Sequence, residues 1–367
     1  MISRFVVDKA SLGLFSQNPR PLRAISFSSS KKPVAKSAPI EVGRMNLFQA
    51  INSAMKIAME TNPRTVHFGE DVLFGGVFRC SMGLSDQFGK SRVFNTPLSE
   101  QGIAGFAIGM AAVGYDVIAE MQFADYIFPG FDQIVNEAAK WRYRAGSTSH
   151  VGGLTIRAPC SGVGHGALYH SQSVESYFAH CPGLVIVMPR GPKQAKGLLL
   201  ASIRSRDPVL FFEPKSLYRA ATDDDVPLGD YELPIGKAEI VQSGTDITVV
   251  AWGTQVARSL QAAAIVAEKH GISVEVIDLQ TIVPWDRDCV VASVQKTGRL
   301  LVTHEATMTN GFGAEIAAEI QSKCFLNLKA PIQRSTGYDT PFPLVWEEFY
   351  IPNKFRLVDD IIKTCQF

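Results

Sequence analysis

The stretch Arg92–Asp125 constrains the fold more than any other part of the chain. It contains a short apolar run, a proline turn, a Gly/Ala-rich helix that begins at Ser99, and a second apolar run from Val117. This order is typical of a β–turn–α–β unit. Such a unit places Glu100 at the carboxyl end of a strand and the start of a helix, where open α/β sheets carry their chemistry. The alternative is that Glu100 only stabilises the N-terminus of the helix.

The same alternation of strand and helix continues along the chain. A helix is expected after a cap at Asn46, and others are expected to begin at caps Asp132 and Thr254. Further helices are expected over 192–204 and 313–323, and strands over 65–68, 153–158, 184–188, 209–212, 247–252, 274–279 and 300–303. Strands that alternate with helices predict doubly wound, parallel α/β sheets.

Composition divides this α/β chain into a first domain over 45–214, a linker over 215–234 and a second domain over 235–367. The linker contains three consecutive aspartates, two prolines and little apolar periodicity. The last part of the chain is expected to be turn-rich because of its prolines, which are Pro331, Pro341, Pro343 and Pro352.

Charge and cysteine usage exclude several classes of protein. The formal net charge is +1, which does not favour nucleic acid or an anionic membrane surface as a partner. No apolar run approaches the ~18 residues of a membrane span. The 6 cysteines are scattered without a C-x-x-C pair, which favours reduced thiols in an intracellular compartment.

Residues 1–40 differ from the rest of the chain. They are basic and serine-rich, and Asp8 is their only acidic residue. This composition is typical of an organelle transit peptide, and the alternative is an ordinary disordered tail.

Several familiar motifs fail on spacing. The segment Gly83–Ser91 resembles a phosphate-binding loop, but five residues separate its glycines where four are needed. The turn Asn310–Gly313 before a helix can receive an anion or be a plain turn. His165 and His170 are not part of a metal-binding pattern.

The polar residues that remain lie near strand ends of the first domain: Glu100, Asp125, Tyr126, His165 and His170. A carboxylate, a tyrosine and a histidine together favour acid/base chemistry. From the residues alone we expect a two-domain α/β enzyme that transfers protons, with its substrate left open.

Longer strings of residues add a resemblance to a known family. They are Phe68–Asp71, Asn95–Gly102, Asp132–Lys140, Gly166–Ser173, His180–Leu184 and Val250–Val256. From about Met45 onward the chain resembles the beta subunit of the thiamine-diphosphate-dependent decarboxylating component of 2-oxo acid dehydrogenase complexes. The segments Phe74–Cys80 and Gln122–Gln133 make it most similar to the branched-chain type.

The resemblance implies a transketolase-like pyrimidine-binding domain followed by a transketolase C-terminal-like domain. It also implies an α2β2 heterotetramer in the mitochondrial matrix, with thiamine diphosphate between the alpha and beta subunits. The family binds the diphosphate and Mg²⁺ with a Gly-Asp-Gly motif, which does not occur in this sequence. By resemblance, the alpha subunit supplies that half of the site.

The resemblance also implies roles for individual residues. Glu100 would be the catalytic glutamate that hydrogen-bonds the aminopyrimidine of the cofactor, with Tyr126 and Leu98 beside the cofactor. His170 would be an active-site histidine that serves proton transfer during delivery of the acyl group. A structural K⁺ ion would be bound by Gly152, Leu154, Thr155, Ser202, Ser205 and Asp207, of which the last three differ from the animal branched-chain form.

The implied function is oxidative decarboxylation of branched-chain 2-oxo acids, an oxidoreductase reaction in the breakdown of leucine, isoleucine and valine. The acyl group would pass to the lipoyl group of a dihydrolipoyl transacylase. Three alternatives stay open at this point. They are a relative that acts on pyruvate or acetoin, a nicotinamide oxidoreductase, and a scaffold without catalytic residues.

Overall fold

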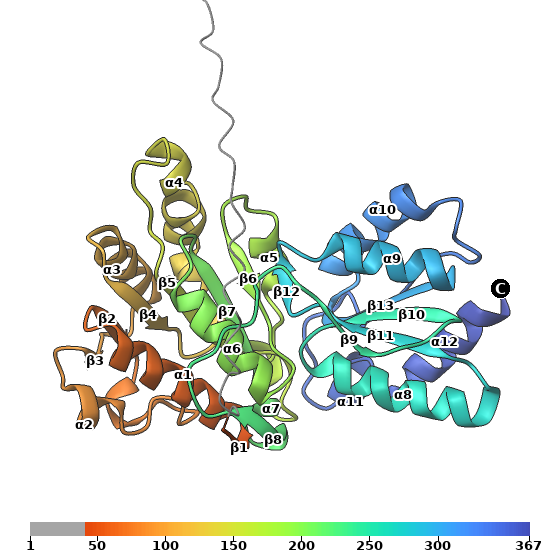
Figure 1. The fold of residues 1–367 in the computed structure, drawn as a ribbon, viewed down its shortest axis with the longest axis horizontal. Coiled ribbons are helices and arrows are strands. Elements are labelled where there is room, and N and C mark those ends of the chain that lie inside the picture. Colours follow the sequence, from red (N-terminus) through yellow and green to blue (C-terminus); the bar gives the residue numbers. More distant parts are fainter. Residues whose placement is uncertain (1–40) are drawn as a thin grey trace, which may run out of the picture. The chain divides into compact units, whose positions relative to one another are not determined.

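The computed structural model describes residues 41–367, so the expected transit peptide over 1–40 lies outside the described residues. The described chain contains two α/β sheets, which confirms the predicted doubly wound fold class (Figure 1). No helix within residues 41–367 is long and apolar enough to cross a membrane.

The first sheet has 7 strands in the order β12-β6-β7-β5-β4-β2-β3. Six of its strands lie within residues 65–214 and run parallel: β2 (Thr65–Gly69), β3 (Val93–Asn95), β4 (Asp116–Glu120), β5 (Leu154–Cys160), β6 (Val185–Val187) and β7 (Val209–Pro214). The edge strand β12 (Thr281–Val283) comes from the second half of the chain and pairs antiparallel with β6. The two halves of the chain are therefore joined through one sheet.

Helices cover both faces of the first sheet, as the alternation of buried side chains along its strands requires. Val117 and Ala119 of β4 pack with α3 (Glu100–Ala112), whereas Ile118 packs with α1 (Leu47–Thr61) and α6 (Pro192–Ile203). Shorter helical segments are η2 (Val72–Phe74), α2 (Leu84–Phe88), η3 (Ala124–Tyr126), η4 (Phe128–Gly130), η5 (Gln133–Ala138), α4 (Trp141–Arg144), η6 (Ala167–Tyr169) and α5 (Glu175–Ala179).

The second sheet has 5 strands in the order β14-β13-β10-β11-β9. They are β9 (Glu239–Gln242), β10 (Ile247–Ala251), β11 (Val274–Asp278), β13 (Leu300–Thr307) and β14 (Gln333–Gly337). Only β9 runs antiparallel to its neighbour. Figure 1 shows α8 (Thr254–His270) and α12 (Lys354–Gln366) on one face, and α9 (Arg287–Thr297) and α10 (Phe312–Cys324) on the other.

The expected linker, 215–234, contains a short helix, α7 (Leu217–Ala220), and a strand, β8 (Thr222–Pro227). This strand pairs antiparallel with β1 (Val42–Asn46). The expected limits of the two domains stay a prediction.

Of the three predicted helix caps, one is confirmed and two are wrong. Asn46 caps α1 in a capping box with Gln49, as expected. Asp132 does not cap its helix, because it is already helical and its carboxylate accepts from Asn136 Nδ2 at 2.6 Å. The cap predicted at Thr254 was also wrong. Gly253 holds the cap position, and the Thr254 hydroxyl donates to Glu305.

The prediction of a turn-rich C-terminal end was also only partly correct. A short helix, α11 (Glu347–Tyr350), lies between Pro343 and Pro352, and the 13-residue helix α12 follows Pro352. Asn353 caps α12 by accepting from the N–H groups of Phe355 and Arg356 at 3.0 Å. Leu357 and Ile361 recur at helical spacing after the last proline and are fully buried.

A buried ion network crosses the middle of the first sheet. Arg157 of β5 donates through Nε and Nη2 to Glu213 of β7 at 2.7 and 2.9 Å, and through Nη1 to Glu120 of β4 at 2.7 Å. Burial raises the pKa of Glu120, but the charge of Arg157 and a hydrogen bond from His67 lower it more, to about 2. The three strands are therefore tied together by one guanidinium.

We predict that Arg157→Met lowers the free energy of unfolding by about 3–5 kcal/mol, because it leaves the carboxylates of Glu120 and Glu213 buried without their cation. Urea unfolding of the full chain at pH 7 measures this change. The stabilisation from Glu120 is present above its unfolded-state pKa and is lost as the pH falls toward about 2. The wild-type chain should lose this part of its stability in acid, and the variant should not.

Arg144→Met is the matched control, since Arg144 contacts Glu137 at 3.0 Å on the surface. We expect it to change the free energy of unfolding by about 1 kcal/mol or less. Equal effects of the two substitutions would contradict a special role for the buried network.

Candidate functional site

Glu100 lies where the sequence predicted it, at the first turn of α3 behind β3. Ser99 caps the helix, and its Oγ accepts from the N–H of Gly102 at 3.3 Å. Because β2, β3 and β4 run parallel, their carboxyl ends meet at one edge of the sheet. The structure therefore places Glu100 at this edge, with segments from the neighbouring strands.

Glu70 pairs with Glu100 at this edge. Glu70 directly follows β2 and is only 4% exposed. Burial raises the pKa of Glu70 to about 7, and the negative charges of Glu100 and Asp71 and a hydrogen bond with Glu100 add to the effect. A carboxyl group with this pKa is partly protonated at neutral pH and can donate a hydrogen bond to Glu100.

Sequence reasoning named Glu70 as the end of a strand but gave it no role. The signal that could have found it is its position, since an acidic residue directly after a buried parallel strand faces the same edge as Glu100.

Tyr126 and His170 form the second part of the site. The Tyr126 hydroxyl lies 2.7 Å from His170 Nε2. Phe123 contacts both rings edge-on, with ring centroids 4.7 Å from His170 and 5.6 Å from Tyr126. Burial raises the pKa of Tyr126, and the negative charges of Asp125, Glu100 and Glu70 add to the effect, so the phenol stays protonated at neutral pH.

Other residues proposed from the sequence have different positions. Asp125 Oδ1 accepts from the N–H groups of Ser171 and Gln172 at 3.1 and 3.0 Å, so this carboxylate holds the chain just after His170. His165 lies in an exposed part of the loop after β5. Leu98 is 80% exposed and lies two residues before Glu100, so an apolar side chain faces solvent beside the acid pair.

The residues expected to bind K⁺ come together away from the acid pair. The N–H of Gly153 donates to the Ser205 carbonyl at 2.7 Å, which brings the start of β5 against the end of α6. A side chain at Gly152 would clash with the backbone of Arg206. The Thr155 hydroxyl is buried and has no hydrogen-bond partner within residues 41–367. An unpartnered buried oxygen beside converging carbonyl groups is compatible with a bound cation.

The side chains of two of these residues are already engaged. Ser202 Oγ donates to the Leu198 carbonyl at 2.6 Å, and Arg142 donates to Asp207 at 2.8 Å. Cation binding would therefore rely mainly on backbone oxygens and on Thr155. Within the described part of the chain, no group of three His, Cys, Asp or Glu residues could hold a metal ion.

Comparisons with known proteins show the family to which the chain belongs. The transketolase pyrimidine-binding domain matches residues 44–221, and the transketolase C-terminal domain matches residues 236–357. The chain is 62% identical to the mitochondrial 2-oxoisovalerate dehydrogenase subunit beta of Dictyostelium discoideum, over 89% of this chain and 88% of the relative. The mitochondrial subunit beta 2 of Arabidopsis thaliana is 61% identical over 88% of this chain and 90% of the relative.

The chain belongs to the family of 2-oxoisovalerate dehydrogenase beta subunits. This family is the beta subunit of the decarboxylating component of branched-chain 2-oxo acid dehydrogenases and depends on thiamine diphosphate. A pyruvate dehydrogenase E1 component subunit beta of Staphylococcus epidermidis is also similar, at 42% identity over 89% of this chain and 100% of the relative.

Solved structures confirm the transketolase fold of this beta-subunit family. A split-gene transketolase, described as an inactive beta4 tetramer, superposes with a TM-score of 0.68 at 20% identity and covers 87% of this chain and 97% of that chain. A transketolase variant from Pichia stipitis has a TM-score of 0.61 at 14% identity and covers 90% of this chain and 47% of that chain.

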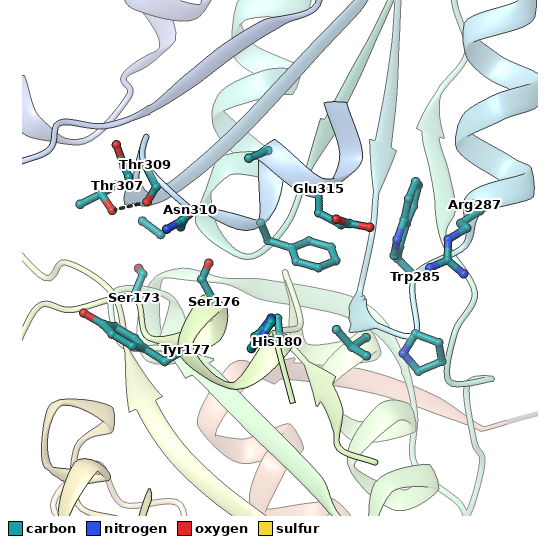
Figure 2. Close-up of a pocket in the computed structure, with 17 residues that line it drawn as sticks. Ser173, Ser176, Tyr177, His180, Trp285, Arg287, Thr307, Thr309, Asn310 and Glu315 are labelled. Carbon is teal, nitrogen blue, oxygen red and sulfur yellow. Dashed lines mark hydrogen bonds between the residues drawn. The ribbon is translucent and has the colours of Figure 1, made fainter. Parts of the chain in front are cut away.

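A cavity with a volume of about 1060 Å³ lies between α5 and the start of α10. Figure 2 shows Ser176, Tyr177 and His180 on one side of it, with Asn310 and Glu315 on the other. Neither Glu100 nor His170 lines this cavity, so the residues with acid/base geometry are at the exposed edge of the sheet.

We predict that Glu100→Gln lowers the pKa of Glu70, because it removes the neighbouring negative charge that raises this pKa. A raised carboxyl pKa makes the wild-type fold lose stability as the pH rises from the unfolded-state value to about 7. Urea unfolding between pH 4 and 8 should show a smaller loss in the variant. Glu268→Gln, at an exposed carboxylate of α8, is the control, and an unchanged Glu100→Gln profile would contradict the pairing.

Proposed function

We propose that this chain is the beta half of an enzyme that oxidatively decarboxylates branched-chain 2-oxo acids and passes the acyl group to a lipoyl group. The observation that carries the proposal is the Glu70–Glu100 pair beside Tyr126 and His170, at the carboxyl edge of the sheet. The sequence relatives, named as 2-oxoisovalerate dehydrogenase subunits, support the substrate class.

Thiamine diphosphate fits these residues by chemistry. When bound, it supplies a stabilised carbanion and an electron sink for decarboxylation. We infer that Glu100 hydrogen-bonds a ring nitrogen of the aminopyrimidine and that Tyr126 and Leu98 contact the same ring. The exposed apolar side chain of Leu98 and the unusual pKa of the Glu70 carboxyl beside Glu100 support this assignment.

Glu70 and Glu100 would hold one proton between them. Burial and the negative charge of Glu100 raise the pKa of Glu70 to about 7, so Glu70 would serve as a proton reserve for the hydrogen bond between Glu100 and the ring nitrogen. His170 would move a proton during acyl delivery. Its ring is fixed for this task by the Tyr126 hydroxyl and by Phe123.

The rest of the site would come from an alpha subunit. The absence of Gly-Asp-Gly from the sequence supports this division, since that motif would otherwise hold the diphosphate and its Mg²⁺. We infer an α2β2 heterotetramer that docks on a dihydrolipoyl transacylase core in the mitochondrial matrix. The mitochondrial relatives from three organisms support the compartment.

A structural K⁺ ion would lie between the start of β5 and the end of α6, with Gly152, Leu154, Thr155, Ser202, Ser205 and Asp207 as its ligand residues. The unpartnered Thr155 hydroxyl is the observation that supports it. Hard cations prefer such oxygen ligands.

We predict that 3-methyl-2-oxobutanoate is decarboxylated only when the chain is mixed with a branched-chain alpha subunit, thiamine diphosphate and Mg²⁺. Glu100→Ala should lower turnover by several orders of magnitude while the heterotetramer still forms. Release of CO₂ measures turnover, and size-exclusion chromatography measures assembly. Full activity of the variant would favour the scaffold alternative, and activity of the isolated chain would contradict the divided site.

The similarity to a pyruvate dehydrogenase subunit makes pyruvate a second candidate substrate. We expect the assembled enzyme to prefer branched 2-oxo acids over pyruvate by their ratio of kcat/KM. One methylene in a pocket changes binding by only ~1–3 kcal/mol, so pyruvate should still react slowly. A preference for pyruvate would assign the chain to the other substrate class.

For the cation we predict that KCl raises the Tm of the full chain above its value in tetramethylammonium chloride at equal ionic strength, because a bound ion stabilises the folded state. Thr155→Val should abolish this difference and leave the chain at least as stable without K⁺, since the variant removes a buried unpartnered hydroxyl. An equal rise in Tm with K⁺ in the wild-type chain and in Thr155→Val would mean that the ion binds at another site.

A further inference from the structure

A long loop connects β5 to α5 and carries His170. It spans residues 161–174 and contains only the single turn η6 as regular structure. The N–H of Ser161 donates to the Gln172 carbonyl at 3.0 Å, which closes the loop at its base. Asp125 holds the last part of this loop through Ser171 and Gln172. The first part must be held by other groups, because backbone donors buried away from water require partners.

Two carboxylates from the second half of the chain hold that first part. The N–H of Gly162 donates to Glu305 Oε2 at 3.0 Å, and the N–H of Gly164 donates to Glu347 Oε1 at 2.7 Å. The other oxygen of Glu305 accepts from the Thr254 hydroxyl at the start of α8. Hydrogen bonds from backbone N–H groups to ionised carboxylates are among the stronger ones in proteins.

The contact at Gly162 is also closely packed. A Cβ atom there would lie 2.8 Å from Glu347 Oε1, 2.5 Å from Ile351 Cδ1 and 3.1 Å from Phe342 Cζ. Phe342 and Ile351 are buried together in a small apolar cluster with Tyr350. The segment around α11 therefore covers the loop through both apolar and charged contacts.

Lys215 lies beside the start of the loop, since its N–H donates to the Cys160 carbonyl at 3.0 Å. It follows β7, is 4% exposed, and its Nζ has no hydrogen-bond partner within residues 41–367. Burial lowers the pKa of this ammonium, and the negative charges of several groups, Asp125, Glu305 and Glu347 among them, oppose that effect. Its Nζ lies 5.9 Å from the ring centroid of Phe123, which also contacts His170.

We propose that Glu305 and Glu347, together with Asp125, are positioning residues that fix the loop carrying His170. The second domain then does more than complete the fold, since it sets the geometry of a histidine that belongs to the first. This inference rests on the role proposed for His170 in acyl delivery, but the contact itself can be tested independently of activity.

The direct test is hydrogen exchange of the peptide that spans residues 161–166, measured by mass spectrometry on the full chain. Glu347→Ala should speed exchange of the Gly164 amide roughly ten- to a hundredfold, because it removes a charge-assisted hydrogen bond. Glu347→Gln keeps an acceptor oxygen and should restore most of the protection. Glu348→Ala, the same change at the exposed next residue of α11, should leave exchange unchanged.

A second readout uses the assembled enzyme. Glu347→Ala should lower lipoyl-dependent turnover about tenfold or more, relative to decarboxylation measured with an artificial electron acceptor. Glu347→Gln should recover the lipoyl-dependent rate. A uniform loss in both assays would mean that Glu347 is needed for folding or assembly and does not position His170.

The two proposals fail in different ways. If wild-type enzyme shows neither activity, the proposed function is wrong, and the exchange experiment still decides whether the carboxylates hold the loop. If exchange at residues 161–166 is the same in Glu347→Ala as in Glu348→Ala, the positioning role is wrong whatever the activity. If Glu347→Ala does not fold, Glu305→Ala and Glu305→Gln provide the same comparison, with faster exchange of the Gly162 amide expected only in Glu305→Ala. Unchanged exchange in Glu305→Ala would overturn the proposal.

Discussion

The guanidinium of Arg157 joins the strands on which the site depends. It bonds Glu120 at the end of β4 and Glu213 near the end of β7, and it lies on β5 between them. Each of these strands leads directly into a functional segment: β4 into Asp125 and Tyr126, β5 into the loop with His170, and β7 into Lys215. A buried ion group adds little net stability when the cost of desolvation is counted, but it strongly disfavours other alignments of the strands.

Charge is distributed unevenly at this edge of the sheet. Burial and the neighbouring negative charge of Glu100 raise the pKa of Glu70 to about 7, so this carboxyl group is partly protonated near neutral pH. The carboxylates farther along the edge accept hydrogen bonds from backbone N–H groups. The same type of side chain therefore serves as a proton carrier at one point and as a structural anchor at another, and local burial and neighbouring charge decide which.

Features that depend on residues close together in the sequence could be predicted well. The cap at Asn46 and the strand–turn–helix around Glu100 follow from local side-chain chemistry and apolar spacing, and both are present in the structure. The cap expected at Asp132 was wrong because this residue is already helical and its carboxylate accepts from Asn136 one turn later. The cap expected at Thr254 was wrong because a tertiary partner competes for its side chain. Thr254 donates to Glu305 on a neighbouring strand.

Long-range contacts left no comparable signal in the sequence. The pairing of Glu70 with Glu100 depends on the order of β2 and β3 in the sheet, and β12 joins the first sheet from the second half of the chain. The bond from Gly164 to Glu347 spans 183 residues of sequence. No periodicity or motif within one segment encodes such partners, so they become visible only when the strands are in place.

The central claim is that Glu100 controls proton removal at the cofactor. The most direct measurement is the rate at which solvent deuterium replaces the proton on the reactive thiazolium carbon of thiamine diphosphate bound to the assembled enzyme, without substrate. We predict fast exchange in the wild-type enzyme and exchange that is slower by several orders of magnitude in Glu100→Gln, with the cofactor still bound. Equal exchange rates in the two enzymes would contradict the account.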